Sequence, residues 1–154
     1  MKSPQALESV AEFHRTFRVP IIEAPAIPAP ERSALRINLL REELEELQQA
    51  IEDEDLVEVA DALADLQYVL SGAVLEFGLG DKFKAIFDEV HRSNMSKTCR
   101  SLKEAEATVE HYRTLQQEGR VEPAGDHFLV YRVADNKVLK NVNYSPADLA
   151  GQLK

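Results

Sequence analysis

The chain has 154 residues, of which 44% are apolar and 29% charged, which is typical of a folded protein with a substantial core. Its formal net charge of −9 opposes non-specific binding to the nucleic-acid backbone, so we expect no nucleic-acid partner. No apolar run approaches membrane-spanning length and no signal-peptide core is present, so we expect a cytoplasmic protein without a membrane partner. Cys99 is the single cysteine, which excludes an intrachain disulfide and a thiolate metal site.

The first part of the chain predicts a helix followed by an extended segment. Ser3-Pro4 is typical of a helix start, and the helix is expected to run to about Phe17. The passage VPIIEAPAIPAP that follows contains four prolines, so it is expected to be extended. It is either a plain connector or a strap that crosses another subunit or borders a site. His14, beside Phe13, is either part of a base pocket or a structural histidine.

Three further helices are predicted at residues 31–51, 55–77 and 81–96. The apolar residues of the first two follow a helical spacing that predicts one buried line on each. These lines are Ile37, Leu40, Leu44, Leu47 and Ile51, and then Leu56, Val59, Leu63, Leu66, Leu70 and Phe77. The short turn between the two helices predicts an antiparallel pair.

After Lys97 the pattern changes to a polar helix in KEAEATVEHYRTLQQEG and a β-hairpin formed by HFLVYRV and VLKNV, with its turn near Asp135-Asn136. The expected fold is all-α: a four-helix core with a small C-terminal β-hairpin appendage. The expected domains are residues 1–97, the core, and residues 98–154, an extension that packs on it. Apolar residues left over by the core, Leu35, Val69 and Val74, predict a homo-oligomer.

Negative charge is concentrated in the two central helices. Residues 42–81 contain thirteen Asp and Glu and no Lys or Arg. At about 100° per residue the acids lie beside the apolar lines, on facing shoulders of the two helices. These acids are Glu43 and Glu46 on one helix and Glu58, Asp61 and Asp65 on the other.

Two like charges about 4 Å apart repel by roughly 4 kcal/mol at an effective dielectric of 20. We therefore expect that some of these acids are protonated, or that cations lie between them. Oxygen ligands without Cys or paired His favour Mg²⁺ or Mn²⁺. The alternative is an acidic surface that only increases solubility.

Four segments carry a resemblance to a known family. EELEELQQAI followed by EVADALADLQYVL resembles the EExxE…ExxD signature of the all-α nucleoside triphosphate pyrophosphatases. That superfamily includes MazG, dimeric dUTPases and phosphoribosyl-ATP pyrophosphatase. EVHRSNMSK and NKVLKNVNYSPADL look like the MazG-related, phosphoribosyl-ATP pyrophosphatase-like branch. Residues 98–134 have no clear counterpart in the resemblance.

The resemblance implies roles for particular carboxylates. Glu43 and Glu46 match metal-ligating glutamates, Asp65 matches the last aspartate of ExxD, and Glu42 resembles the glutamate that orients or deprotonates the attacking water. Ala62 stands where many relatives have Glu, so the fourth ligand is expected to be Asp61, with Glu58 as the second choice.

Positive and polar residues after the acidic helices are expected to contact the substrate phosphates. They are Arg92, Asn94, Lys97, Lys137, Lys140 and Tyr144. The implied reaction is Mg²⁺-dependent cleavage of a nucleoside triphosphate between its α and β phosphates, which gives the monophosphate and pyrophosphate. Relatives form homodimers or dimers of dimers, and the same is expected here.

Three alternatives stay open at this point. One is a non-catalytic, metal-dependent regulatory or assembly module, because ExxD is broken at Ala62. Another is hydrolysis of phosphoribosyl-ATP itself. A di-iron bundle is disfavoured, since it needs two ExxH pairs and the chain offers only Asp88-x-x-His91 in a helix.

Overall fold

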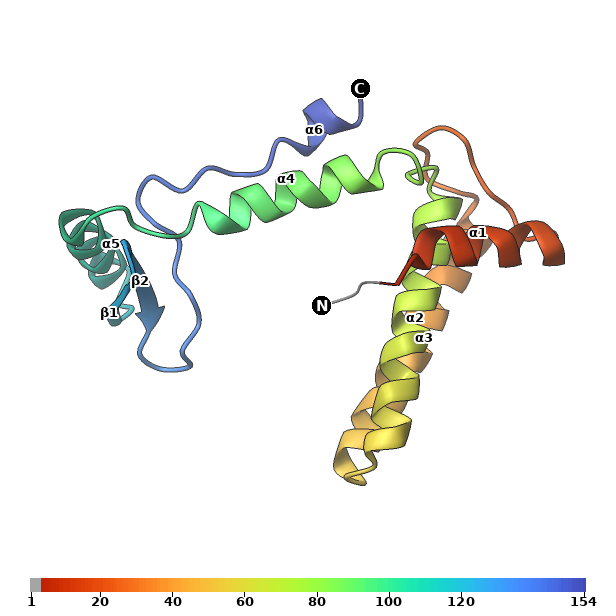
Figure 1. Ribbon diagram of the computed structural model, residues 1–154, viewed down its shortest axis with the longest axis horizontal. Coiled ribbons are helices and arrows are strands. Elements are labelled where there is room, and N and C mark those ends of the chain that lie inside the picture. Colours follow the sequence, from red (N-terminus) through yellow and green to blue (C-terminus); the bar gives the residue numbers. More distant parts are fainter. Residues whose placement is uncertain (1–3) are drawn as a thin grey trace. The chain divides into compact units, whose positions relative to one another are not determined.

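The computed structural model describes residues 4–154, and this part of the chain is mostly helical (Figure 1). Its elements are α1 (Ala6–Phe17), α2 (Pro30–Glu52), α3 (Leu56–Glu76), α4 (Phe83–Met95), α5 (Leu102–Thr114), β1 (Gly119–Ala124), β2 (His127–Arg132) and α6 (Leu149–Gln152). The expected mostly helical fold with a small C-terminal β-hairpin is confirmed. Within residues 4–154, no helix has both the length and the apolar character needed to cross a membrane.

The chain divides into two compact units, one ending at Phe83 and one beginning at Lys84. α4 therefore belongs almost entirely to the second unit. The four-helix core and the domain boundary after residue 97 stay predictions.

α2 and α3 form the antiparallel hairpin predicted from the short turn between them. Pro30 occupies the first turn of α2, where a missing backbone N–H costs nothing. Asp55 caps α3, since its side chain accepts hydrogen bonds from the backbone N–H groups of Val57 and Glu58. A Cβ added to Gly72 would lie 2.7 Å from Arg36 Nη1, so Arg36 of α2 packs against α3 at Gly72.

The large apolar residues that were predicted to be buried in this hairpin are largely exposed. Six residues expected in the buried lines are between 42% and 80% exposed: Ile37, Leu44, Ile51, Leu56, Leu63 and Leu70. Ala50 and Ala62 are instead buried, and their small side chains suit the close approach of two helices. The larger apolar side chains therefore occupy the face that the partner helix leaves open. We call these six residues the open apolar face.

α1 and the proline-rich segment cover the C-terminal end of α3. Val10 and Ala11 of α1 pack on Leu75, and Val74, expected on an oligomer surface, is only 5% exposed and so is not available to a partner. The start predicted for α1 depends on Ser3, which lies outside the described residues; the described helix begins at Ala6.

The proline-rich segment is extended, as predicted, and is held by backbone hydrogen bonds. The Ile22 N–H donates to Leu75 O at 3.1 Å, and the Ala26 N–H donates to Phe77 O at 3.1 Å. Gly78 has a φ of +67°, and a Cβ there would lie 2.0 Å from the Ala24 carbonyl oxygen. A glycine is thus needed where the segment crosses the end of α3.

The second unit has a core of its own, made by Cys99, Ala105, Val130 and Leu139. The hairpin pairs β1 with β2, with Ala124 opposite His127, and its loop is Gly125-Asp126. The predicted pairing of HFLVYRV with VLKNV is present only in part. Tyr131 and Val138 form an isolated antiparallel bridge, and beside it the Arg132 N–H donates to Lys137 O and the Leu139 N–H donates to Val130 O, both at 2.8 Å. Gly125, with a φ of +64°, supplies the positive φ that suits a two-residue hairpin loop.

Candidate functional site

Four carboxylates of α2 and α3 act electrostatically on Glu43. Glu43 is half-buried, whereas Glu42, Glu46, Asp61 and Asp65 are exposed. Burial raises the pKa of Glu43, and the charges of Asp65, Glu46, Glu42 and Asp61 raise it further. The negative field expected from the sequence is therefore centred on one side chain in the middle of the hairpin.

The residue at position 62 differs from the acids around it in being apolar and buried. Ala62 is 4% exposed, so an acid there would be enclosed by the protein. Asp61 is exposed and contributes to the raised pKa of Glu43, whereas Glu58 is not among the causes of that rise. Asp61 therefore acts electrostatically on Glu43, and the choice between Asp61 and Glu58 as a metal ligand stays a prediction.

These acids are not assembled into a finished metal site. Residues 4–154 contain no group of three or more His, Cys, Asp or Glu side chains placed to hold a metal ion. The charged groups that raise the pKa of Glu43 are all carboxylates, the ligand type that suits Mg²⁺ or Mn²⁺. Metal ligation by Glu43, Glu46, Glu58, Asp61 and Asp65 stays a prediction.

Replacing Glu43 with Gln is expected to raise the Tm of the metal-free protein at pH 7 by about 2–4 °C, equivalent to about 1 kcal/mol. Because folding raises the pKa of Glu43, its ionisation at neutral pH opposes folding. The cost is absent below the ordinary pKa of 4.5 and develops as the pH rises through the folded-state pKa. Circular dichroism melts should therefore show the gain at pH 7 and none below pH 4.5.

Glu45→Gln is the matched control for this stability measurement. Glu45 is an exposed residue of α2 whose charge is not among the causes of the raised pKa of Glu43. An equal Tm gain in both variants would show a general effect of net charge, and a Tm loss in Glu43→Gln would contradict the prediction.

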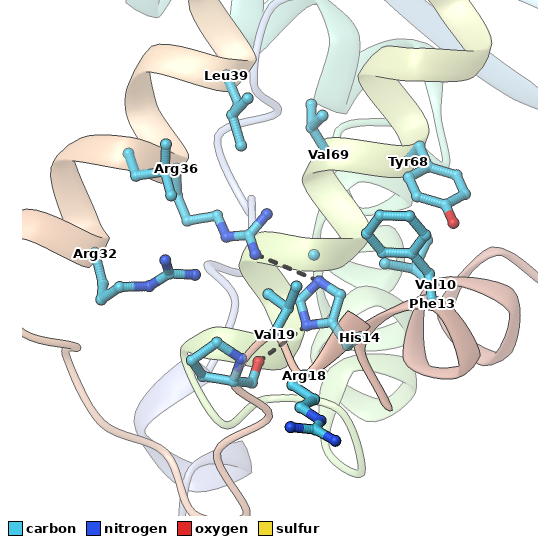
Figure 2. Close-up of a pocket in the computed structure, with 13 residues that line it drawn as sticks. Val10, Phe13, His14, Arg18, Val19, Arg32, Arg36, Leu39, Tyr68 and Val69 are labelled. Atoms are coloured by element: carbon cyan, nitrogen blue, oxygen red, sulfur yellow. Dashed lines mark hydrogen bonds between the residues drawn. The ribbon is translucent and has the colours of Figure 1, made fainter. Parts of the chain in front are cut away.

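One helical turn from Glu43 and Asp65 lies a cavity of about 410 Å³ between α1, α2 and α3. Figure 2 shows Phe13 and Tyr68 on one side of it, and Arg32 and Arg36 on the other. The Phe13 and Tyr68 rings meet edge to face, with centroids 5.7 Å apart. The remaining lining is largely aliphatic, with Val10, Val19, Pro20, Leu35, Leu39, Val69 and Gly72, together with His14 and Arg18. The volume is in the range of small-molecule sites.

A buried ion cluster forms the wall of this cavity on the α2 side. Glu76 is 1% exposed and accepts hydrogen bonds from both Arg32 and Arg36, with Arg32 Nε at 3.0 Å from Oε2. Burial pushes the pKa of Glu76 upward, but hydrogen bonds from Arg32 and Arg36 outweigh it and lower the pKa. The same pairing raises the pKa of Arg32. Glu76 is thus an ionised anchor for two guanidinium groups.

His14 completes the cluster and is both buried and part of the cavity lining. Its Nδ1 lies 2.9 Å from the Pro20 carbonyl oxygen, which can only accept, so Nδ1 carries the proton. Its Nε2 then accepts from Arg36 Nη2 at 3.3 Å. Burial lowers the pKa of His14, and the charge of Arg36 adds to this despite the opposing Pro20 hydrogen bond. A neutral His14 therefore fits this position.

In the second unit, Arg92 anchors the C-terminal tail to α4. Its guanidinium donates to Glu89, to Ser145 Oγ at 3.0 Å and to the Pro146 carbonyl oxygen at 3.0 Å. Hydrogen bonds from Arg92 and from the Asp148 backbone lower the pKa of Glu89 to about 2. The tail of the chain thus lies along α4.

The other residues predicted to contact phosphates lie in the same unit. Tyr144 Oη is 2.8 Å from Ser93 Oγ, and Lys140 Nζ lies 4.6 Å from the centre of the Tyr144 ring. Lys97 Nζ donates to Asn94 Oδ1 at 2.8 Å, whereas Lys137 is exposed in the turn after Asp135. Arg92 contacts the C-terminal tail, and Lys140 and Tyr144 belong to that tail. The substrate contacts of all three residues stay predictions.

The sequence reasoning missed Arg32, Arg36, Glu76 and Tyr68. A signal was present, since Arg32 and Arg36 are one turn apart on a single face of α2. Arg36 is only 7% exposed, and an arginine so deeply buried requires a carboxylate partner. That partner is forty residues away in the chain, beyond the reach of helical spacing.

Two comparisons with known proteins find relatives of this chain. The model of the family described as phosphoribosyl-ATP pyrophosphohydrolase matches residues 10–94, more than half of the chain. An uncharacterized protein of Acanthamoeba polyphaga mimivirus is 23% identical, over 87% of this chain and 90% of that protein. The matched residues contain the acidic hairpin, most of α1 and nearly all of α4. The chain therefore belongs to the phosphoribosyl-ATP pyrophosphohydrolase family, within the MazG-like all-α nucleoside triphosphate pyrophosphatase superfamily.

Proposed function

We propose that this protein is a Mg²⁺-dependent nucleoside triphosphate pyrophosphohydrolase that cleaves between the α and β phosphates. The observation that supports it best is the raised pKa of Glu43, which is caused in part by the neighbouring acids. From Glu42 to the end of the second acidic helix, the two helices contain no Lys or Arg that could offset this charge. Such a group of negative charges gains most from divalent cations that also hold a polyphosphate. The family match supports the pyrophosphohydrolase chemistry.

In this proposal Glu43, Glu46 and Asp65, together with Asp61 or, as the second choice, Glu58, would hold Mg²⁺. When bound, this ion would neutralise the triphosphate and favour ionisation of water. Glu42 accepts the proton of the attacking water. The water oxygen forms a bond to the α phosphorus, the bond to the bridging oxygen breaks, and pyrophosphate leaves with that oxygen. Arg92, Asn94, Lys97, Lys137, Lys140 and Tyr144 are proposed phosphate contacts.

A second candidate substrate is phosphoribosyl-ATP, which the description of the matching family names. It contains the same triphosphate, and the same bond would be cleaved. The remaining alternative is a regulatory module that binds metal without turnover, suggested by Ala62 in the acidic pattern.

Pyrophosphate release from the ribo- and deoxyribonucleoside triphosphates and phosphoribosyl-ATP, with Mg²⁺ or Mn²⁺, tests the proposal. We expect turnover that stops when the metal is chelated and returns when Mg²⁺ is restored. Release of orthophosphate would contradict cleavage at the α–β bond. Normal metal binding without turnover of any of these compounds would support the regulatory alternative.

We also propose that the chain forms a homo-oligomer, a dimer or a dimer of dimers, through the open apolar face. Its six large apolar residues repeat every seven positions on each of two neighbouring helices. Large exposed apolar patches are uncommon on monomers, and a second copy offers a matching surface. Sedimentation velocity is expected to show an oligomer for the wild type and a monomer for Leu44→Glu with Leu63→Glu.

A further inference from the structure

The cavity between α1, α2 and α3 has an unusual polar lining among its side chains. Its charged members are three guanidinium groups, those of Arg18, Arg32 and Arg36, which donate hydrogen bonds and cannot accept them. Both ring nitrogens of His14 are already used, by Pro20 and by Arg36. Tyr68 is the one lining side chain able both to donate and to accept freely. The cavity therefore favours a ligand that presents acceptors.

A second observation concerns the hydrogen bonding of Arg36, which lines the cavity. Arg36 is 7% exposed, and its Nη2 donates to Glu76 and to His14. Its buried Nε–H has no hydrogen-bond partner among residues 4–154. Buried donors are nearly always paired, so this group is suited to an acceptor supplied from outside the chain.

The other walls suit a flat, largely apolar ring. Phe13 and Tyr68 offer aromatic surface, and Leu39 and Val69 also line the cavity (Figure 2). Leu39 precedes Glu43 by four residues and Val69 follows Asp65 by four, about 6 Å along each helix. A nucleotide with its phosphates at these carboxylates would thus direct its base toward the cavity.

We propose that this cavity binds the nucleobase and selects bases whose ring edge carries carbonyl oxygens over bases with an amino group at the same position. This inference deepens the proposed function, on which its link to hydrolysis rests. A carbonyl oxygen accepts from a guanidinium, as in the pairing of arginine with the acceptor edge of guanine. An amino group would place its N–H bonds against the N–H bonds of arginine and leave donors unpaired.

The test measures binding of nucleosides without phosphates, in pairs that differ at one position. Uridine and cytidine differ by carbonyl and amino at position 4, and inosine and adenosine differ likewise at position 6. We expect calorimetry or saturation-transfer NMR to show about 10-fold tighter binding of the carbonyl member in at least one pair. Equal affinities within both pairs, or tighter binding of the amino members, would overturn the inference.

Variants of lining residues test whether the preference for carbonyl-bearing bases depends on this cavity. Arg36→Lys is expected to reduce the carbonyl preference to about 2-fold or less, because an ammonium lacks the planar fork. Arg41→Lys, an exposed arginine of the same helix that bonds to Asn38, should leave the preference unchanged. If Arg36→Lys does not fold, Tyr68→Leu replaces it and should weaken both members of a pair by at least about 3-fold through the lost aromatic surface. Unchanged affinities in that variant would exclude this cavity.

The same pairs, as triphosphates, separate this inference from the proposed hydrolysis. A carbonyl preference in nucleoside binding without pyrophosphate release from any triphosphate would retain the base site and reject the hydrolase. Hydrolysis with equal kcat/KM within both pairs, UTP with CTP and ITP with ATP, together with equal nucleoside affinities within both pairs, would retain the hydrolase and reject the base selection.

Discussion

Asp65→Asn is expected to lower kcat/KM for pyrophosphate release by about 10²-fold or more, while the helical circular dichroism spectrum stays that of the wild type. Asp65 is exposed on α3, and its charge is the largest contribution from any neighbouring group to the raised pKa of Glu43. Its replacement by the isosteric Asn removes one proposed oxygen ligand from an exposed position. The measurement is steady-state pyrophosphate release at saturating and at limiting Mg²⁺.

Glu46→Gln is expected to behave in the same way, since Glu46 also contributes to the field at Glu43 from an exposed position. Glu45→Gln serves as the matched control on the same helix and should retain wild-type kcat/KM. Full activity in both Asp65→Asn and Glu46→Gln would remove these carboxylates from the mechanism. An equal loss of kcat/KM in Glu45→Gln would mean that the losses come from the change in net charge and not from particular carboxylates.

Glu76→Gln is expected to lower the free energy of unfolding by about 3–5 kcal/mol. Glu76 is 1% exposed and is the shared partner of Arg32 and Arg36. In the variant, the hydrogen-bond partners of Arg36 are the amide of the new glutamine and the neutral His14. The buried charge of Arg36 then has no negative charge among its hydrogen-bond partners. Urea unfolding followed by circular dichroism measures the loss as a lower midpoint at a similar slope.

Asp88→Asn is the control for this stability prediction. It removes the charge from an ion pair with Lys84 in which the two side chains are 60% and 87% exposed. Solvent screens such a pair, so the midpoint should stay at the wild-type value within error. A Glu76→Gln loss below about 1 kcal/mol would mean that Arg36 finds another way to reach solvent or a partner.

Much of the fold follows from local signals in the sequence. Asp55 caps α3 where the sequence placed a helix start, and the proline-rich segment is extended because its prolines cannot continue a helix. The acidic hairpin was predicted from helical spacing, which requires only the constant rotation of about 100° per residue. Such features depend on neighbours in the chain and are therefore readable from it.

Two local predictions failed at least in part, and for different reasons. The large residues Leu44 and Leu63 lie on the open apolar face, whereas Ala50 and Ala62 are buried. Hydrophobic spacing identifies an apolar side of a helix but not which neighbour covers it. The hairpin of β1 and β2 turns at Gly125-Asp126 and not near Asp135-Asn136. β1 was not predicted because it lacks an alternating apolar pattern and has Pro123 as its fifth residue.

By itself, the sequence determined that negative charge accumulates on two successive helices. The same acidic segments carried the resemblance to the family. Only the tertiary structure decided that Glu43 is the half-buried centre of that charge, and that Asp61 rather than Glu58 contributes to it. The structure alone also joined Arg36 to Glu76, forty residues apart, and placed both beside His14. The reason is physical: burial and charge coupling depend on distances through space, which helix packing sets and residue spacing does not.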